Sequence, residues 1–376
     1  MDLSLNEREA RLKQEARQFM EREAPKDILL ELEKTETGCT RDLWGKVVKT
    51  GWLGTLIPAQ YGGAGGSLTL AGVLLEELGR GPLPGPFFSS SILASLIILA
   101  AGGEEQKKQL LPAISQGKNI FCVALAEKEY EGSPQSIQMT ASPANGDFIL
   151  HGTKLFVRDA GAATHILCAA RSRRGGDPTD GVSLFLVDKK SPGLSVRPLS
   201  GFMGWSYEVK FDSVKVPGNA GLGPLGEGYK PLGQAIEKAI PILCAYQVGG
   251  CQAVFEMSVE RSQTREQFGT PIGRFQRIQD HIIEIVNHLD AARWTTYEAL
   301  WKLDTGKPAR ESVHMAKAVT SEAYFQACTS AHHVHGGIGY SESFGLTLHT
   351  KMSRGLYHQL GDPRHHRRQL AGLLGF

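Results

Sequence analysis

Three histidines, an aspartate and an arginine lie within twelve positions near the C-terminus, in the stretch GLYHQLGDPRHH (residues 355–366). These residue types could bind a metal ion or assist a nucleophile. The spacing argues against a metal, because His365 and His366 are adjacent and diverge by about 100° on a helix, while His358 precedes the Gly-Asp-Pro break. With no further carboxylate cluster nearby, we predict no metal site. Asp362, followed directly by proline, instead predicts the capped start of a last helix.

Composition and charge set broad limits on the class of protein. The chain has 376 residues, of which 41% are hydrophobic, enough for two or three domains. Its formal net charge of +2 gives no reason to expect a nucleic-acid partner. The N-terminus is charged and amphipathic, and the longest apolar run, residues 92–101, is too short to span a membrane. None of the six cysteines forms a CxxC pair, so we expect reduced thiols, no membrane association and a cytoplasmic location.

The periodicity of apolar residues changes twice along the chain. A 3.6-residue period dominates up to about residue 117, short runs of β-forming residues follow up to about 217, and long helical periods return from about 227. This pattern predicts an α+β protein with a helical N-terminal domain (1–118), a central antiparallel β-sheet or barrel domain (119–226) and a C-terminal four-helix bundle (227–376).

Six short motifs occur along the chain in an order that resembles the acyl-CoA dehydrogenase flavoprotein family, in a divergent, bacterial-type form. The motifs are GWLGTLIPAQYGGAGGS (51–67), ALAEKEYEGSP (124–134), GTKLFVRDAGAATHILCAAR (152–171), FDSVKVP (211–217), TREQFGTPIGRFQ (264–276) and HGGIGYSESF (335–344). The resemblance covers nearly the whole chain. It implies the acyl-CoA dehydrogenase fold, with FAD held between the β domain and the bundle, and a homodimer or homotetramer in which a neighbouring subunit touches the far end of the dinucleotide.

The reaction implied by the resemblance removes a proton from the α-carbon of an acyl-CoA thioester and a hydride from its β-carbon. Such a site needs a base, a hydrogen-bond donor for the thioester oxygen and a flavin face.

The resemblance assigns residues of the bundle to FAD. Arg265 would bind the pyrophosphate of the partner subunit's FAD, Phe268 its adenosine end, and Gln276 would make a nearby hydrogen bond. Arginine suits phosphate because its planar guanidinium donates two parallel hydrogen bonds. Without the other motifs, Arg265 and Phe268 would be interpreted as a surface arginine and a core phenylalanine.

Further residues of the bundle are assigned in the same way. Gly336 and Gly337 leave room for another chain's cofactor, because they lack a Cβ atom. His333 stands where the family usually has glutamine. In bacterial relatives, Asp362 and Arg364 would fall near the FAD.

The β domain departs from the family pattern at the positions that would line the flavin. These positions are Leu125 and Ala126, followed by Ser133 after what looks like a one-residue insertion, and Ala126 replaces a hydroxyl donor. Phe156 would cover the flavin. Arg158 replaces a small hydroxyl residue or proline, and it would either favour the anionic reduced flavin or point to solvent.

Neither family position for the catalytic base holds a carboxylate. Leu360 stands where many members carry glutamate, although its backbone N–H could still bind the thioester oxygen. The second position falls on Ala239, with Glu237 two residues away and about 200° around the helix. Tyr246, seven residues after Ala239 on the same face, replaces a glutamate of many bacterial relatives and is either a hydrogen-bond donor or a packed aromatic.

These residues favour an FAD-dependent acyl-CoA dehydrogenase that oxidises the α,β bond in fatty-acid or ring-thioester degradation and passes electrons to an electron-transfer flavoprotein. Two alternatives stay open. The chain could be the partner subunit of a heteromeric dehydrogenase, such as a heterotetramer with a homologous subunit that supplies the base. It could also be a non-catalytic thioester- or protein-binding module that has lost FAD.

Overall fold

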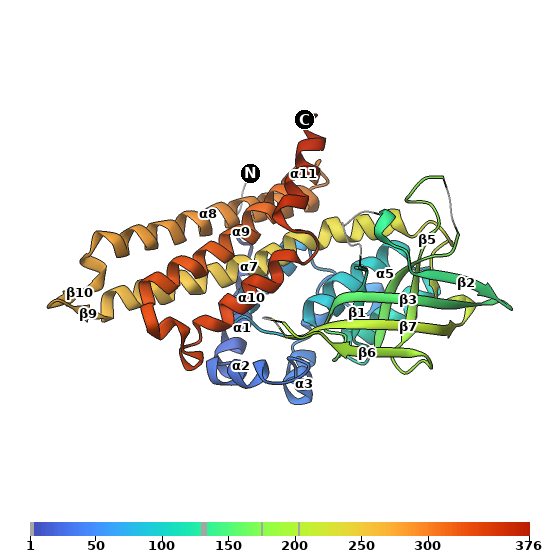
Figure 1. Cartoon of the computed structure of the whole chain (residues 1–376), viewed down its shortest axis with the longest axis horizontal. Coiled ribbons are helices and arrows are strands. Elements are labelled where there is room, and N and C mark those ends of the chain that lie inside the picture. The colour runs from blue at the N-terminus through green and yellow to red at the C-terminus, as the bar shows by residue number, and fades with distance from the viewer. Residues whose placement is uncertain (1–3, 129–133, 174–175, 202–203) are drawn as a thin grey trace. The chain divides into compact units, whose positions relative to one another are not determined.

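The computed structural model describes the chain except residues 1–3, 129–133, 174–175 and 202–203 (Figure 1). It contains two compact units. One unit comprises Met1–Glu33, Ser67–Leu83 and Ile240–Phe376, and the other comprises Lys34–Gly66 and Pro84–Ala239. The predicted N-terminal helical segment therefore contributes to both units.

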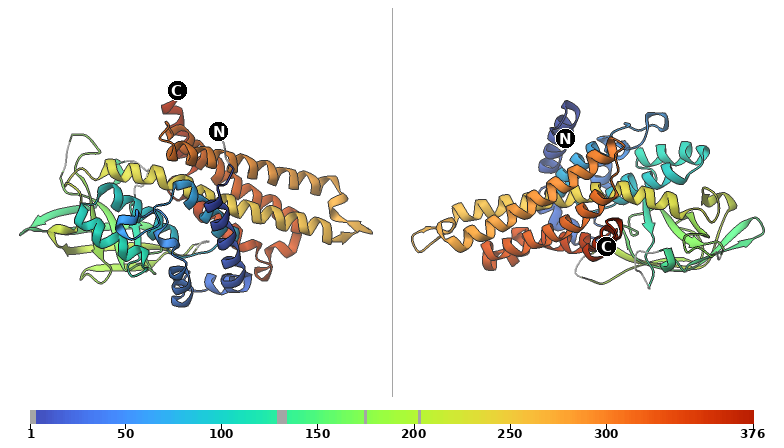
Figure 2. Two further views of the ribbon diagram at one scale, coloured as in Figure 1. Left: turned by 180° about the vertical axis from the view of Figure 1, so that it is seen from behind. Right: turned by 90° about the horizontal axis from the view of Figure 1, so that it is seen from above.

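The first unit is helical (Figures 1 and 2). Its helices are α1 (Glu7–Glu23), α2 (Lys26–Glu33), α4 (Leu68–Arg80), most of α7 (Tyr229–Thr264), α8 (Gln276–Asp304), α9 (Arg310–His335), α10 (Leu346–His358) and α11 (Pro363–Leu373). The long helices α8 and α9 pack against each other along their length. Shorter elements connect the helices: the strands β9 (Glu266–Gln267) and β10 (Thr270–Pro271), and the 3₁₀ turns η6 (Ile272–Arg274), η7 (Gly336–Tyr340) and η8 (Glu342–Phe344).

Glycines allow α4 and α7 to pack in close backbone contact. A Cβ atom on Gly79 would lie 1.9 Å from the carbonyl oxygen of Tyr246, and one on Gly249 would lie 1.8 Å from that of Glu76. No side chain larger than hydrogen fits at either position, so these two glycines fix how α7 passes α4.

The second unit is built on a sheet and short helices (Figure 1). Its helices are α3 (Arg41–Lys49), α5 (Ser95–Ala101) and α6 (Glu104–Ser115), with the π-helix η3 (Phe87–Ala94) and the 3₁₀ turns η1 (Trp52–Gly54), η2 (Ala59–Tyr61), η4 (Pro134–Ser136) and η5 (Gly218–Ala220). Its strands are β1 (Phe121–Ala124), β2 (Thr140–Ala144), β3 (Asp147–Arg158), β4 (His165–Arg171), β5 (Val182–Asp188), β6 (Leu194–Pro198), β7 (Ser206–Val216) and β8 (Gly221–Leu222).

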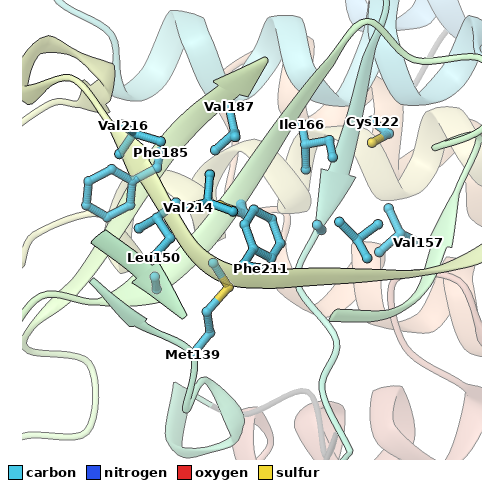
Figure 3. Packing of buried hydrophobic residues seen from close by; sticks show 14 of the residues in the cluster. Cys122, Met139, Leu150, Val157, Ile166, Phe185, Val187, Phe211, Val214 and Val216 are labelled. Atoms are coloured by element: carbon cyan, nitrogen blue, oxygen red, sulfur yellow. The ribbon is translucent and has the colours of Figure 1, made fainter. Parts of the chain in front are cut away.

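The strand order is β6-β7-β3-β2-β4-β5-β8, with β1 paired to β4. Most pairs are antiparallel, but β1 and the start of β2 pair with β4 in parallel. One hydrophobic cluster of this unit contains Leu150, Phe185, Phe211 and Val214, which are buried together (Figure 3). The predicted order of a helical N-terminal region, a central sheet and a helical C-terminal region is thus confirmed.

Two local predictions can be compared directly with the structure. Asp362 caps α11, with its carboxylate accepting a hydrogen bond from the backbone N–H of His365 at 2.7 Å, as predicted. All six cysteines are free, and every one except the half-buried Cys39 is buried.

No helix among the described residues is long and apolar enough to cross a membrane.

A buried ion pair fixes the chain after β1. The Lys154 ammonium, which is fully buried on β3, donates to the Glu127 carboxylate at 2.6 Å and to the Leu125 carbonyl oxygen at 3.1 Å. The same carboxylate accepts from the backbone N–H groups of Gln138 and Met139. Burial lowers the pKa of Lys154, and the nearby Glu127 carboxylate opposes this effect. Each buried charge therefore depends on the other.

We predict that Lys154→Met lowers the free energy of unfolding by about 3–5 kcal/mol, because it leaves the Glu127 carboxylate buried without its cation. Lys215→Ala is the matched control. Lys215 pairs with Asp147 at 3.0 Å in the same unit, but its side chain is 67% exposed, so we expect a loss below about 1 kcal/mol. Urea unfolding followed by tryptophan fluorescence measures both variants, and equal losses would show that the buried pair has no special role.

Candidate active site

The loop between α10 and α11 places Leu360 in the left-handed region of backbone conformation, with φ 58°, and Gly361 follows with φ 103°. Leucine adopts this conformation at a cost of about 1–2 kcal/mol. Within the part of the chain that the structure describes, the Leu360 N–H donates no hydrogen bond. A half-buried N–H group without a partner can bind a carbonyl oxygen of another molecule.

The positions expected for a base hold no exposed carboxylate. Ala239 is fully buried on α7, and Glu237 is half-buried on the same helix. Tyr246 is buried, and its hydroxyl donates to the Leu83 carbonyl oxygen at 3.0 Å. This hydrogen bond gives the Tyr246 hydroxyl a structural partner, because it joins α7 to the chain that follows α4.

The hairpin formed by β9 and β10 presents Phe268 at its tip (Figure 1). Phe268 and Gly269 have φ values of 55° and 77°, the pattern of a tight two-residue turn. The Phe268 side chain is 94% exposed, and its ring meets that of Phe275 edge-on at 6.0 Å. Arg265 begins the hairpin with an exposed side chain, which pairs with no carboxylate of the described residues. The hairpin thus offers an apolar ring and a guanidinium to another molecule. Gln276, also exposed, begins α8 directly after the hairpin.

The backbone at the end of α9 is exposed, so another molecule can come close to it. A Cβ atom on Gly336 or Gly337 would meet no atom within 4 Å, and both residues are exposed. Gly336 has φ 63° and ψ −144°, a conformation that only glycine adopts readily. His333, also exposed, stacks on His281 with ring centroids 4.8 Å apart. Arg364 lies exposed on α11, while the Asp362 carboxylate is used as the helix cap.

In the β unit, hydrogen bonds from β3 hold the backbone at the first two predicted flavin positions. Leu125 O accepts from the Lys154 ammonium, and Ala126 O accepts from the Leu155 N–H at 2.8 Å. Both residues are half-buried. The third predicted position, Ser133, lies outside the described residues.

Phe156 and Arg158 lie at the end of β3, where the pairing with β7 shifts register between Lys154 and Val157. This irregularity places Phe156 at φ 54° with its ring 66% exposed. Arg158 is half-buried rather than free in solvent, and its charge lies close enough to Asp159 to oppose the rise in the pKa of that carboxyl, which is caused mainly by burial.

Sequence reasoning missed three polar groups beside these positions. The first is the Lys154–Glu127 pair, and the second is Asp159, a buried residue whose Oδ2 accepts from the Ser89 hydroxyl while its Oδ1 has no partner. The third comprises His366 and His314, whose rings meet beneath the Leu360 loop. The only signal in the sequence was the polar type of each residue, because their partners are far away along the chain.

Within each compact unit, taken by itself, exposed residues fit a part of FAD. An isoalloxazine ring is flat and apolar on its faces, which suits the exposed Phe156 of one unit, and a pyrophosphate suits the exposed Arg265 of the other. Among the described residues, no group of three histidines, cysteines or acidic residues is placed to hold a metal ion.

A helical N-terminal region, a central sheet and a helical C-terminal region, with these exposed residues, define a flavoprotein oxidoreductase. Family models agree over nearly the whole chain: the N-terminal, middle and C-terminal domains of acyl-CoA dehydrogenase match residues 6–118, 122–214 and 226–372. The chain belongs to the acyl-CoA dehydrogenase family.

Relatives resemble the chain over most of its length, and solved structures resemble it over nearly all of it. The Caffeyl-CoA reductase-Etf complex subunit CarC of Acetobacterium woodii is 28% identical over 88% of each chain. PigA, solved with FAD and proline, has a TM-score of 0.92 and 25% identity over 100% of this chain and 99% of its own. The Tcur3481-Tcur3483 steroid ACAD variant has a TM-score of 0.87 and 28% identity over 99% and 98% of the two chains. The predicted fold is therefore confirmed.

We predict that Arg265→Ala weakens FAD binding about tenfold to a hundredfold, because it removes charge-assisted hydrogen bonds to phosphate. Arg274→Ala, an exposed arginine in the turn after the same hairpin, is the control and should keep its flavin. Flavin absorbance per protein after gel filtration, and titration of the stripped protein with FAD, measure the effect. Full flavin retention in Arg265→Ala would remove this residue from the site.

We predict that Tyr246→Phe lowers the free energy of unfolding by about 1 kcal/mol, because the Leu83 carbonyl loses its donor. FAD content should not change. Turnover should also stay within about twofold, since a hydroxyl bound to a backbone carbonyl is not free to serve the substrate. Steady-state kinetics and urea unfolding separate the two effects, and a large fall in turnover at unchanged stability would give Tyr246 a role in the reaction.

Proposed function

We propose that the chain is an FAD-dependent oxidoreductase that acts on the Cα–Cβ bond of an acyl-CoA thioester in the cytoplasm and exchanges electrons with an electron-transfer flavoprotein. The observation that carries this proposal is that Arg265 and Phe268 are both exposed on the hairpin after α7, an arrangement suited to an adenine dinucleotide. The name of PigA with FAD and the name of the CarC subunit of an Etf complex support the cofactor and the electron partner.

The chain's own residues account for binding and polarisation. The Leu360 N–H binds the thioester carbonyl oxygen, which stabilises the negative charge that develops there as the α-proton leaves. Arg265, Phe268, Gln276 and the backbone at Gly336 would hold the dinucleotide of a partner subunit's FAD. When bound, FAD supplies the acceptor for the hydride from the β-carbon. The loop and the hairpin therefore position the substrate oxygen and the cofactor, but neither removes a proton.

A second candidate role follows from the residues at the base positions. Leu360 and Ala239 have no titratable side chain, and the Tyr246 hydroxyl is bound to the Leu83 carbonyl. Loss of a general base costs about 10²- to 10⁴-fold in rate. We therefore propose that the chain works as one subunit of a heteromeric dehydrogenase in which a homologous chain supplies the base. The name Tcur3481-Tcur3483 steroid ACAD joins two proteins, which supports a complex of two different chains. The word steroid in that name suggests a bulky, ring-bearing acyl group for this chain as well.

A thioester screen followed by flavin bleaching tests these roles. The purified protein should show flavin absorbance, and anaerobic addition of acyl-CoA thioesters of different lengths and ring content should bleach it only when a homologous subunit encoded nearby is co-expressed. Bleaching by the chain alone at a normal rate would show that it carries its own base. A colourless protein that takes up no added FAD would reject both roles and leave a non-catalytic binding module.

A further inference from the structure

Two histidines, His366 and His314, form a hydrogen-bonded chain that ends on the strained loop after α10. His366 Nε2, on α11, lies 2.9 Å from the carbonyl oxygen of Leu360, and His366 Nδ1 lies 2.8 Å from Nδ1 of His314, on α9. His366 is 1% exposed and His314 is half-buried. The two rings thus connect α9, α11 and the loop.

The hydrogen-bond partners define where the protons lie. A carbonyl oxygen can only accept, so His366 Nε2 must carry a hydrogen. In the neutral ring, Nδ1 is then an acceptor, and it receives the hydrogen on Nδ1 of His314. The chain therefore runs in one direction, from His314 through His366 to Leu360 O.

Burial keeps both rings neutral. It lowers the pKa of His366 to about 3 and that of His314 to about 4, and the charges around them add to the effect. Lys317 and His365 disfavour a proton on His366, and His365 and Arg310 disfavour one on His314. A neutral pair holds one arrangement of hydrogens at physiological pH.

Neighbouring contacts leave the loop little room to relax. A Cβ atom on Gly361 would lie 2.6 Å from His366 Nε2. The fully buried Lys317 donates to the carbonyl oxygens of Leu356 at 3.0 Å and Tyr357 at 3.4 Å, and thereby holds the end of α10. The Asp362 cap holds the start of α11. Between these two anchors, His366 contributes the side-chain hydrogen bond to the strained residue itself.

We propose that His366 and His314 are positioning residues that hold Leu360 in its left-handed conformation, so that its N–H stays free for the thioester oxygen. This inference rests on the proposed function only for the identity of the bound oxygen. His366 Nε2–H donates to the carbonyl oxygen of Leu360. This bond fixes the peptide group that follows Leu360, while the N–H of Leu360 belongs to the peptide group that precedes it. His314 contributes by holding the His366 ring in the required tautomer.

Hydrogen exchange in the full-length protein, as purified with its flavin, tests the positioning without a substrate. In His366→Leu, the Gly361 amide, which donates to the His358 carbonyl oxygen, should exchange about fivefold to tenfold faster, as expected from the loss of one net hydrogen bond. His366→Gln should restore slow exchange, because its amide can donate to Leu360 O and accept from His314. His358→Gln removes an exposed imidazole near the same loop and should change nothing. Unchanged exchange in His366→Leu would overturn the proposal.

Selective ¹⁵N labelling of histidine gives a spectroscopic check of the same chain. We expect His366 to carry its hydrogen on Nε2 and His314 to carry its hydrogen on Nδ1. A hydrogen on Nδ1 of His366, with Nε2 bare, would contradict the assignment.

A matched pair of ligands separates the positioning from the proposed function. Octanoyl-CoA has the thioester oxygen, and S-octyl-CoA lacks it. Wild-type protein should bind octanoyl-CoA more tightly, and His366→Leu should reduce this preference about tenfold, with His366→Gln retaining it. If wild type shows no preference while loop exchange responds as expected, the oxygen-binding role of Leu360 fails but the positioning holds. A preference that persists in His366→Leu would refute the link between the histidines and the N–H.

Discussion

Buried carbonyl groups at the end of α10 must find donors, and this requirement shapes the candidate active site. A helix leaves its last carbonyl oxygens without internal partners, and burial makes such groups costly. Lys317 supplies donors to Leu356 and Tyr357, and His366 supplies one to Leu360. A buried ammonium is costly by itself, and burial lowers the pKa of Lys317 to about 8. The fold tolerates the buried Lys317 ammonium because three oxygens, including the Ser321 hydroxyl, accept hydrogen bonds from its Nζ atom.

The β unit solves the same problem with a different charged group. After β1 the chain leaves the sheet, and the Leu125 carbonyl receives a hydrogen bond from Lys154. The Glu127 carboxylate balances that cation and also accepts two backbone N–H groups. In the β unit the buried lysine fixes the backbone at the predicted position Leu125, and in the helical unit it fixes the helix end that precedes Leu360. Since neither lysine touches the reacting atoms in the proposed function, each is a structural support for residues whose backbone is exposed to a ligand.

The features predicted correctly from sequence are the local ones. The change from helical to strand periodicity follows from side-chain patterns a few residues long, and Asp362 was predicted as a cap from its place before proline. The same periodicity predicted the order of the three regions, and the family resemblance agreed with it. The long-range pairs had no comparable signal, because Tyr246 and Leu83 are 163 residues apart, and His314 and His366 are 52 apart.

Backbone strain was also invisible in the sequence. Phe156, Phe268 and Leu360 are residues that avoid positive φ, yet each adopts it at a predicted ligand position. A glycine at these positions would by itself have indicated a positive φ, because glycine adopts such a conformation freely. For these three residues the conformation depends on contacts made elsewhere, such as the β3–β7 irregularity and the His366 hydrogen bond.

Under the proposed function, the loop explains how a chain can lack a base and keep an oxygen-binding N–H group. A general base depends on a side chain, so replacing a carboxylate by leucine removes it completely. An oxygen-binding N–H depends on backbone conformation, which other residues enforce, so the same replacement leaves it in place. His366 would have no reason to hold a strained Leu360 if the loop had lost every role, because relaxation of a left-handed leucine would stabilise the fold. The retained strain is therefore better explained by a subunit that still binds a thioester, with proton removal assigned to another chain, than by a chain that has become a purely structural partner.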